Sequence, residues 1–292
     1  MKHYVVKIYK SVGKINSNSL KKLEIGGKIG FLKQVILSSS RFLKEDNKNW
    51  HLKFFCQSSY EQYIVVKIID IPESTPNEKL KDIVDSERLD YREYDELSTL
   101  SCILQDCEMN SNIAERLSLS VRGSKSIKCN DFTQRPSHYN HIDGRGLSFF
   151  SRITNQEDNF KRQIILVSLA YAYLGAIEYI GNQLAEAVND TYDDIKKLRE
   201  LYINTAKFNS TFFFHQPVLI KNPSLTEIWK KIDKTLDVNA SSGELLEQLA
   251  NVHYILNLDN ERNAKVLQDR WNKWFSILGI FISILGLFEL FK

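Results

Sequence analysis

Five cysteine and histidine residues, of the types that bind zinc, fall from position 102 to position 141: Cys102, Cys107, Cys129, His138 and His141. Thiolate and imidazole ligands build structural zinc sites when they occur in short, regularly spaced pairs. The Cys-x4-Cys and His-x2-His spacings found here are not among the strong zinc patterns. Cys102 and Cys107 also fall within residues 97–119, where we expect an amphipathic helix and where they would act as small apolar residues. We therefore predict no bound metal ion.

The segment RPSHYNH, residues 135–141, brings an arginine and histidines close together in the chain. It resembles the Arg-x(4–6)-His signature of HEPN ribonucleases. The resemblance implies that the arginine and a histidine would stabilise and protonate the phosphate during RNA cleavage. That signature belongs on a helix, whereas Pro136 favours a loop here. The alternative is a polar loop whose charged side chains are ordinary surface groups.

The same loop belongs to a wider group of basic residues that could bind an anionic ligand, such as a nucleotide or an oligonucleotide. The group comprises Arg122, Lys125, Lys128, Arg135, His138, His141 and Arg145. Residues 1–53 are also basic, with twelve Lys or Arg against three acidic residues, although the whole chain carries only +3. Such a charge attracts nucleic acid, nucleotides or an anionic membrane. The alternative is a set of lysines that keep strand faces solvated and protect sheet edges.

Familiar catalytic patterns do not occur in the chain. There is no Ser-His-Asp order, no pair of carboxylates in a glycine-rich context and no dinucleotide fingerprint. The segment GGKIG, residues 26–30, lacks both the spacing and the terminal Lys-Ser/Thr of a P-loop. We predict that the protein is not an enzyme and carries no cofactor.

Two apolar segments are candidates for a membrane span, residues 163–177 and residues 274–288. Neither holds a charge, and both are shorter than the roughly 20 residues that a bilayer favours. The first is rich in Ala and Tyr and returns at once to amphipathic sequence, which is typical of a core helix. The second is denser in Ile, Leu and Phe, and membrane-interface residues precede or begin it: Arg270, Trp271, Lys273 and Trp274. We predict that this C-terminal segment spans the membrane.

Small and polar residues follow one face of that segment at helical spacing. The face comprises Asn272, Ser276, Gly279, Ser283, Gly286 and Glu289. One interpretation is a pore in a homo-oligomer, with this face lining a water-filled lumen. The other is close packing between helices, which small residues permit in membranes. The spacing alone does not decide between them.

The elements that must carry these residues change in type near residue 155. Strands are expected at residues 4–9, 50–56, 62–71 and 146–153, and the stretch from 121 to 145 is expected to be loop-like. Helices are expected at residues 158–187 and 191–209, and from Ser224, where Glu227 completes a capping box. Gly243 is expected to interrupt the helical pattern, and residues 244–292 then read as one long helix.

The predicted architecture is an α+β N-terminal cytosolic domain over residues 1–155, a helical bundle and stalk over 156–270, and a single C-terminal transmembrane helix over 271–292. The N-terminus has no apolar signal sequence, and the four cysteines are scattered, which favours a reducing compartment. We expect a single-pass protein of the inner (plasma) membrane, with its N-terminal domain in the cytoplasm.

The stretch KFNSTFFFHQPVL, residues 207–219, and residues 258–290 resemble the stalk and first span of divergent members of the CorA-like channel superfamily. The family's Gly-Met-Asn signature does not occur in the chain. The resemblance implies an oligomeric funnel with a pore lined by the retained span.

The expected function is that of a homo-oligomeric membrane channel, as a tetramer or pentamer, whose cytosolic domain gates the pore. By analogy of architecture, it could serve as a nucleotide- or nucleic-acid-gated effector of bacterial anti-phage defence. The alternative is a tail-anchored cytosolic RNA-binding protein or nuclease, whose C-terminal helix is only an anchor.

Overall fold

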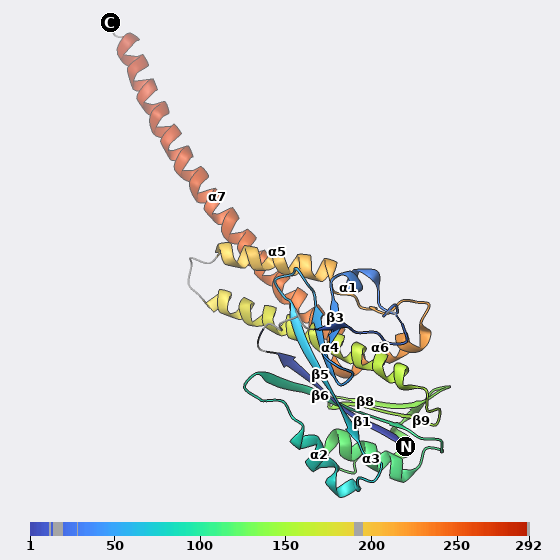
Figure 1. The fold of residues 1–292 in the computed structure, drawn as a ribbon. Coiled ribbons are helices and arrows are strands. Elements are labelled where there is room, and N and C mark those ends of the chain that lie inside the picture. The colour runs from blue at the N-terminus through green and yellow to red at the C-terminus, as the bar shows by residue number, and fades with distance from the viewer. Residues whose placement is uncertain (12, 14–19, 28, 190–194, 291–292) are drawn as a thin grey trace.

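The computed structural model describes residues 1–292 except 12, 14–19, 28, 190–194 and 291–292. Side-chain surroundings are described for the same residues, apart from 188–189, 195, 253, 255–264 and 277–290. Strands and short helices come first along the chain, and long helices follow (Figure 1). The predicted order, a mixed α/β region followed by helices, is therefore confirmed. Strand β9 (Gly146–Ser151) ends and helix α4 (Glu157–Asn189) begins where the change was expected.

Within the described residues the strands form one nine-stranded sheet in the order β2-β3-β4-β5-β1-β6-β9-β8-β7. The remaining strands are β1 (Lys2–Ser11), β2 (Lys21–Lys22), β3 (Arg41–Lys44), β4 (Asn49–Phe54), β5 (Gln62–Ile71), β6 (Tyr94–Leu104), β7 (Thr133–Gln134) and β8 (Tyr139–Asp143). Neighbouring strands run antiparallel except for β6 and β9, which are parallel. The strands expected at 4–9, 50–56, 62–71 and 146–153 are therefore confirmed.

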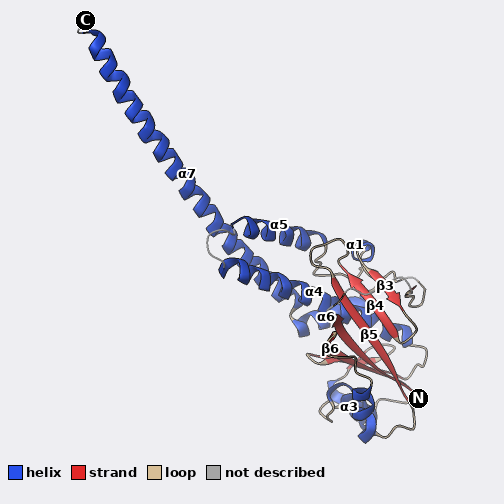
Figure 2. Ribbon diagram, turned by 60° about the vertical axis from the view of Figure 1, so that its left-hand side comes forward, coloured by secondary structure: helices blue, strands red, loops and turns tan. Residues whose placement is uncertain are grey.

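The central strand β1 has both faces buried, and its alternate residues point to opposite layers. Val6 and Ile8 join the large hydrophobic core beneath α4, while Val5 joins the smaller cluster beneath helix α2 (Leu80–Ser86). Helix α3 (Ser111–Arg122) covers the same side as α2 (Figures 1 and 2). The sheet thus lies between α2 and α3 on one side and the long helices on the other.

The helix expected over residues 97–119 was wrong in its first half, where β6 runs to Leu104. Residues Ser98–Leu104 are all buried, since β6 lies between β1 and β9 with both of its faces covered. A strand buried on both faces loses its alternation, and its periodicity then cannot be told from that of a buried helix. Cys102 consequently lies on a strand, as a small buried residue, while Cys107 lies in the loop before α3. The loop expected over 121–145 also contains the short strands β7 and β8.

Helix α4 is the core helix of the folded body. It is long and apolar enough to cross a membrane, but 67% of its most apolar window is buried inside the protein. Residues from Phe160 to Leu184 along this helix belong to the same hydrophobic core as the sheet. The hydroxyl group of Tyr173 is fully buried and donates a hydrogen bond to the carbonyl oxygen of Phe212 at 2.8 Å. The expectation that residues 163–177 form a core helix therefore agrees with the burial of α4.

The remaining long helices are α5 (Ile195–Thr211), α6 (Pro223–Leu236) and α7 (Val238–Leu290), and a short helix α1 (Gln34–Ser38) lies nearer the N-terminus. The capping box predicted at Ser224 was wrong, because Asn222 is the N-cap residue and Pro223 occupies the first turn. Asp237 has a φ of 53° and makes the sharp break between α6 and α7.

Helix α7 is continuous over 53 residues, so Gly243 does not interrupt it. The long final helix expected over 244–292 is therefore confirmed as far as Leu290, and it begins earlier than predicted. Val238, Leu245 and Leu249 are buried in the main core at its root. Beyond this root, α7 extends away from the body as a rod (Figures 1 and 2). At about 1.5 Å per residue the whole helix is about 80 Å long.

Candidate functional site

The projecting part of α7 carries apolar side chains that no part of the folded body covers. Every residue from Lys265 to Ser276 is exposed. Trp271 is 62% exposed, Trp274 67% and Phe275 64%, and the rings of Trp271 and Phe275 lie 5.9 Å apart between centroids. Leu267, Trp271 and Trp274 recur at helical spacing, so they share one face of the rod. Water surrounds this face unless a bilayer or another protein covers it.

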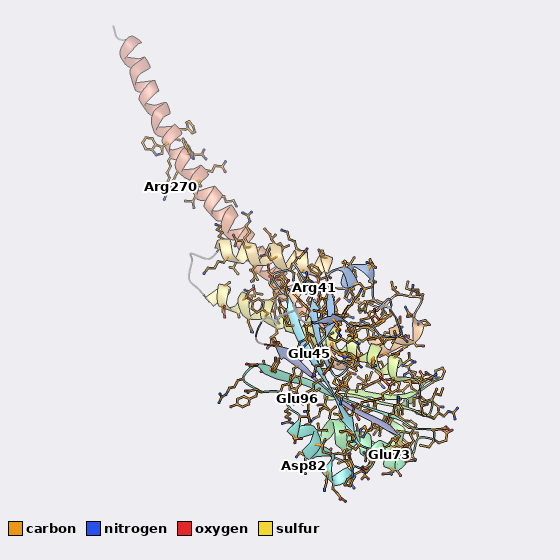
Figure 3. All side chains as sticks on the ribbon, viewed as in Figure 1. Arg41, Glu45, Glu73, Asp82, Glu96 and Arg270 are labelled. Carbon is orange, nitrogen blue, oxygen red and sulfur yellow. The ribbon has the colours of Figure 1, made fainter. Side chains whose placement is uncertain are left out.

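The predicted membrane-interface residues all lie on this exposed segment. Arg270 and Lys273 alternate with Trp271 and Trp274, and Figure 3 shows Arg270 on the rod well away from the body. Of the predicted pore-lining residues, Asn272 and Ser276 are exposed on the same segment. The surroundings of the other four predicted pore-lining residues lie outside the description: Gly279, Ser283, Gly286 and Glu289. The pore-lining face therefore stays a prediction. The single C-terminal span likewise stays a prediction.

The seven predicted anion-binding residues do not converge on one point. Lys125 pairs with Glu115 at 2.8 Å, and the Nζ atom of Lys128 donates to the carbonyl oxygen of Lys125 at 3.0 Å. The backbone N–H of Arg135 donates to the carbonyl oxygen of His138 in the loop between β7 and β8. The segment RPSHYNH is therefore not helical, as Pro136 indicated.

His138 is a core residue. Its ring stacks on Phe149 at 4.6 Å, and its Nε2 atom lies 3.2 Å from Nε2 of Gln163 on α4. Burial, and to a smaller extent the charge of Arg135, lowers the pKa of His138 to about 4. The ring is therefore neutral at pH 7, and its burial keeps it from acting on an external phosphate.

Three of the seven, Arg122, His141 and Arg145, do meet at one place, the turn between β8 and β9. Nε and Nη2 of Arg122 both donate to Oδ2 of Asp143, and Nε2 of His141 lies 3.0 Å from the same oxygen. The other oxygen of Asp143 accepts the backbone N–H groups of Arg145 and Gly146. Burial alone would raise the pKa of Asp143, but these hydrogen bonds hold it well below its usual range. The turn is thus fixed by a charged carboxylate.

A cavity of about 380 Å³ opens beside this turn, between the sheet, α2 and the end of α3. Its lining includes five cationic side chains, Lys7, Lys81, Arg88, Arg122 and Arg145, and two acidic ones, Asp85 and Glu96. Figure 3 shows Glu96 and Asp82 on the side of the sheet that α2 covers. We call this space the turn cavity.

The floor of the turn cavity holds an ion pair between a buried lysine and a partly exposed glutamate. Lys7 points away from α4, its side chain is 1% exposed, and its Nζ atom lies 2.8 Å from Oε1 of Glu96. Glu96 also accepts a hydrogen bond from Thr99 at 3.1 Å and lies 3.4 Å from Nε of Arg88. Arg88 is shared with Asp85 at 3.0 Å. The acidic groups of the cavity are therefore already neutralised by its cations.

Lys81 and Arg145 complete the wall and leave it positive. Within the described part of the chain, neither side chain has an acidic partner within ion-pair distance. Arg122 is neutralised by Asp143, so the excess positive charge of the turn cavity resides on Lys81 and Arg145. A concave surface with such an excess attracts anions.

Ser120 lines the same cavity and lies 3.2 Å from Nε2 of His3, a pair that could be mistaken for a nucleophile and its base. Nε of Arg116 donates to Nδ1 of His3 at 3.1 Å, so the proton of the neutral ring is on Nε2. Burial, and then the charge of Arg116, lowers the pKa of His3 to about 3. His3 therefore donates toward Ser120 and Ser101 and cannot accept a proton from either. This network is structural.

Three residues of the turn cavity, Lys7, Lys81 and Arg88, were not identified from the sequence. Lys7 did leave a signal, because it is the one charged residue within the apolar and aromatic run of residues 4–9, YVVKIY. A lysine in a buried strand is rare unless it is paired. Among the described residues, no group of three or more His, Cys, Asp or Glu side chains is arranged to hold a metal ion.

Comparison with known proteins adds no relative. No protein-family model matches the chain, and neither a curated protein nor a solved structure matches it.

Proposed function

We propose that this protein is a homo-oligomeric membrane protein in which the far end of α7 crosses the bilayer and lines a pore. The observation that supports this most directly is that every residue from 265 to 276 is exposed, with two tryptophans and a phenylalanine among them. A soluble protein rarely exposes so many large apolar groups on an isolated helix. Something outside the folded body must cover them.

The energy available from covering these rings is considerable. Each aromatic side chain buries about 150–250 Å². At about 25 cal/mol per Å², three rings that are now mostly exposed would contribute roughly 10 kcal/mol, as an upper bound. The hydrocarbon core of a bilayer would cover the apolar residues that follow. The membrane interface suits Trp271 and Trp274, which Arg270 and Lys273 flank.

Length supports the same proposal. Residues 271–290 are helical and span about 30 Å at 1.5 Å per residue, which is the thickness of a hydrocarbon core. Helix α4, the other apolar helix, is occupied by the core of the body and has no free surface to offer lipid over most of its length. The basic residues before the span place the body on the cytoplasmic side by the positive-inside rule.

A single helix encloses no channel, so the pore requires several copies of α7. We propose that the face bearing Asn272 and Ser276, continued by Gly279, Ser283 and Gly286, points toward the axis of this assembly. The larger apolar residues on the rest of the circumference then face lipid or neighbouring helices. If the end of α7 served only as an anchor, its function would not depend on which face carries the small residues.

Single-channel recording in planar bilayers tests this proposal, using the full-length protein beside a variant that ends after Arg270. We expect discrete currents from the full-length protein alone. A second variant replaces Ser276, Gly279, Ser283 and Gly286 by leucine and is expected to lose the current. Its matched control replaces Ile277, Phe281, Ile284 and Phe288 by leucine and is expected to keep it.

Verified insertion without current would contradict the pore and leave α7 as an anchor. Release of the protein from membranes by alkaline carbonate would contradict the span itself.

A further inference from the structure

We infer that the turn cavity binds a compact phosphate-bearing ligand, such as a polyphosphate or a sugar phosphate. The inference rests on the geometry of the folded body and holds whether or not α7 forms a pore. If the proposed function is correct, this ligand is a candidate regulator of the pore.

The size and the walls of the cavity define the ligand class. A volume of about 380 Å³ lies at the small end of the range for ligand sites, which is about 300–1,000 Å³. Its apolar lining consists of aliphatic side chains such as Val84, Leu119 and Val121, and no aromatic ring lies among the lining residues. A nucleobase would find no stacking partner there, whereas a phosphate needs only donors and positive charge.

The charges are arranged as a built site and not as a scatter of surface lysines. The side chain of Lys7 is almost completely buried and pairs with Glu96. Both residues lie in the lining of the cavity. Glu96 in turn binds Arg88 and Thr99, so the floor is a connected network of charged and polar side chains. Burial of a lysine costs several kcal/mol in desolvation, a cost that is offset only when the charge is paired.

Hydrogen bonds also hold the side wall of the cavity in place. Asp143 fixes Arg122 by two hydrogen bonds and fixes the backbone of Arg145 by a third, so both arginines depend on one carboxylate. Lys81 approaches from α2 on the opposite side. Among the cations that line the cavity, Arg145 and Lys81 have no acidic partner in the described residues, and a bound phosphate would supply that partner.

A small ligand fits these observations better than a nucleic acid. Nucleic-acid binding uses a basic strip that follows many phosphates along a strand. The other cations near the turn cavity are engaged elsewhere: Lys125 binds Glu115, and Lys128 binds a backbone carbonyl. The two cavity cations without acidic partners in the described residues, Lys81 and Arg145, thus face one concavity and do not form a strip.

Isothermal titration calorimetry of the full-length protein in detergent tests the inference, with inorganic pyrophosphate as the probe. We expect binding that weakens by about tenfold or more in Lys81→Glu and in Arg145→Glu, since each removes a charged contact and adds a repulsive one. Both side chains are exposed, so neither variant should impair folding. Lys22→Glu is the matched control, because Lys22 is an exposed lysine on the far edge strand of the sheet. It changes the net charge equally and should leave the affinity within about twofold.

Absence of pyrophosphate binding, or equal weakening by Lys22→Glu, would overturn the inference. Tighter binding of a single-stranded RNA oligonucleotide than of pyrophosphate, lost in the same two variants, would overturn the assignment to a small ligand. Because calorimetry needs no current, failure of the pore and failure of this site are separate results.

Discussion

The ammonium nitrogen of Lys7 lies 2.8 Å from the carboxylate of Glu96, beneath a cavity whose other walls are also charged. Lys7 is a residue of the central strand, and Glu96 is a residue of β6, its neighbour in the sheet. The two side chains join the middle of the sheet to the turn cavity. The same pair therefore contributes to the stability of the sheet and to the charge of the proposed ligand site.

Removing one member of the pair should destabilise the protein more than removing both. Glu96→Gln leaves the buried ammonium group of Lys7 without its counter-ion, which costs about 2 kcal/mol of unfolding free energy once the partial exposure of Glu96 is allowed for. The double variant Lys7→Met with Glu96→Gln removes the buried charge and should recover part of this loss. Denaturant unfolding of the four proteins in a double-mutant cycle measures the coupling. If the losses of unfolding free energy in the two single variants simply add in the double variant, Lys7 and Glu96 do not stabilise each other.

Two glycines beside the turn cavity should respond very differently to alanine. A Cβ atom at Gly146 would lie 1.8 Å from the carbonyl oxygen of Thr99, so Gly146→Ala must push β9 away from β6. We expect a loss of about 3 kcal/mol or more of unfolding free energy. Gly144→Ala is the matched control, since nothing lies within 4 Å of its added Cβ atom, and its effect should stay within about 0.5 kcal/mol. Equal melting temperatures for the two variants would show that the parallel pairing of β6 and β9 is wrong.

Stability should fall as the pH drops below 6.5, through His3 and His138. Burial holds the pKa of these two histidines at about 3 and about 4 in the folded protein, whereas both take up a proton near pH 6.5 when unfolded. The unfolded state therefore binds more protons, and each histidine lowers the unfolding free energy by about 1.4 kcal/mol per pH unit over this window. The loss continues down to about pH 4 for His138 and about pH 3 for His3.

Unfolding midpoints measured from pH 7 to pH 4 check this prediction. His3→Gln and His138→Gln should each flatten the pH dependence while lowering stability at pH 7. Curves parallel to that of the unsubstituted protein would contradict the assignment of neutral rings.

Tryptophan fluorescence should report membrane insertion directly. The chain has four tryptophans, of which Trp50 and Trp229 are buried in the body and Trp271 and Trp274 are exposed on the rod. In vesicles containing brominated lipid, we expect quenching of the emission from the two exposed residues alone. The double variant Trp271→Phe with Trp274→Phe should abolish this quenching and retain the emission of the body. Unchanged quenching in that variant would place the lipid contact elsewhere.

Much of the fold follows from local pattern. The β-branched and aromatic runs of β1, β4 and β5 and the long apolar stretches of α4 and α7 were all predictable from local pattern. β6 was not predictable, because its burial on both faces is a consequence of its neighbours and not of its own residues. The start of α6 was predicted one residue too late, for a local reason. Ser224 suits an N-cap position, but Pro223 suits the first turn of a helix and belongs to α6.

The turn cavity illustrates a different limit. Arg122 and Arg145 were predicted to bind an anion, but their companions in space are Lys7, Lys81 and Arg88, which belong to β1, to α2 and to the loop after α2. These segments meet only through the sheet order, in which β1 and β6 become neighbours and β9 lies beside β6. His138, in contrast, looked polar in sequence and is a core residue, because Phe149 and Gln163 enclose it.

The root of α7 also determines how far its tip can travel. Val238, Leu245 and Leu249 hold the first turns against the core, and the helix continues without a break to Leu290. Beyond Leu249 the helix is a stiff lever about 60 Å long, and a tilt of about 5° at its buried root moves the free end by about 5 Å. Repacking of a few buried side chains in the body is thereby magnified into a movement of several ångströms at the tip.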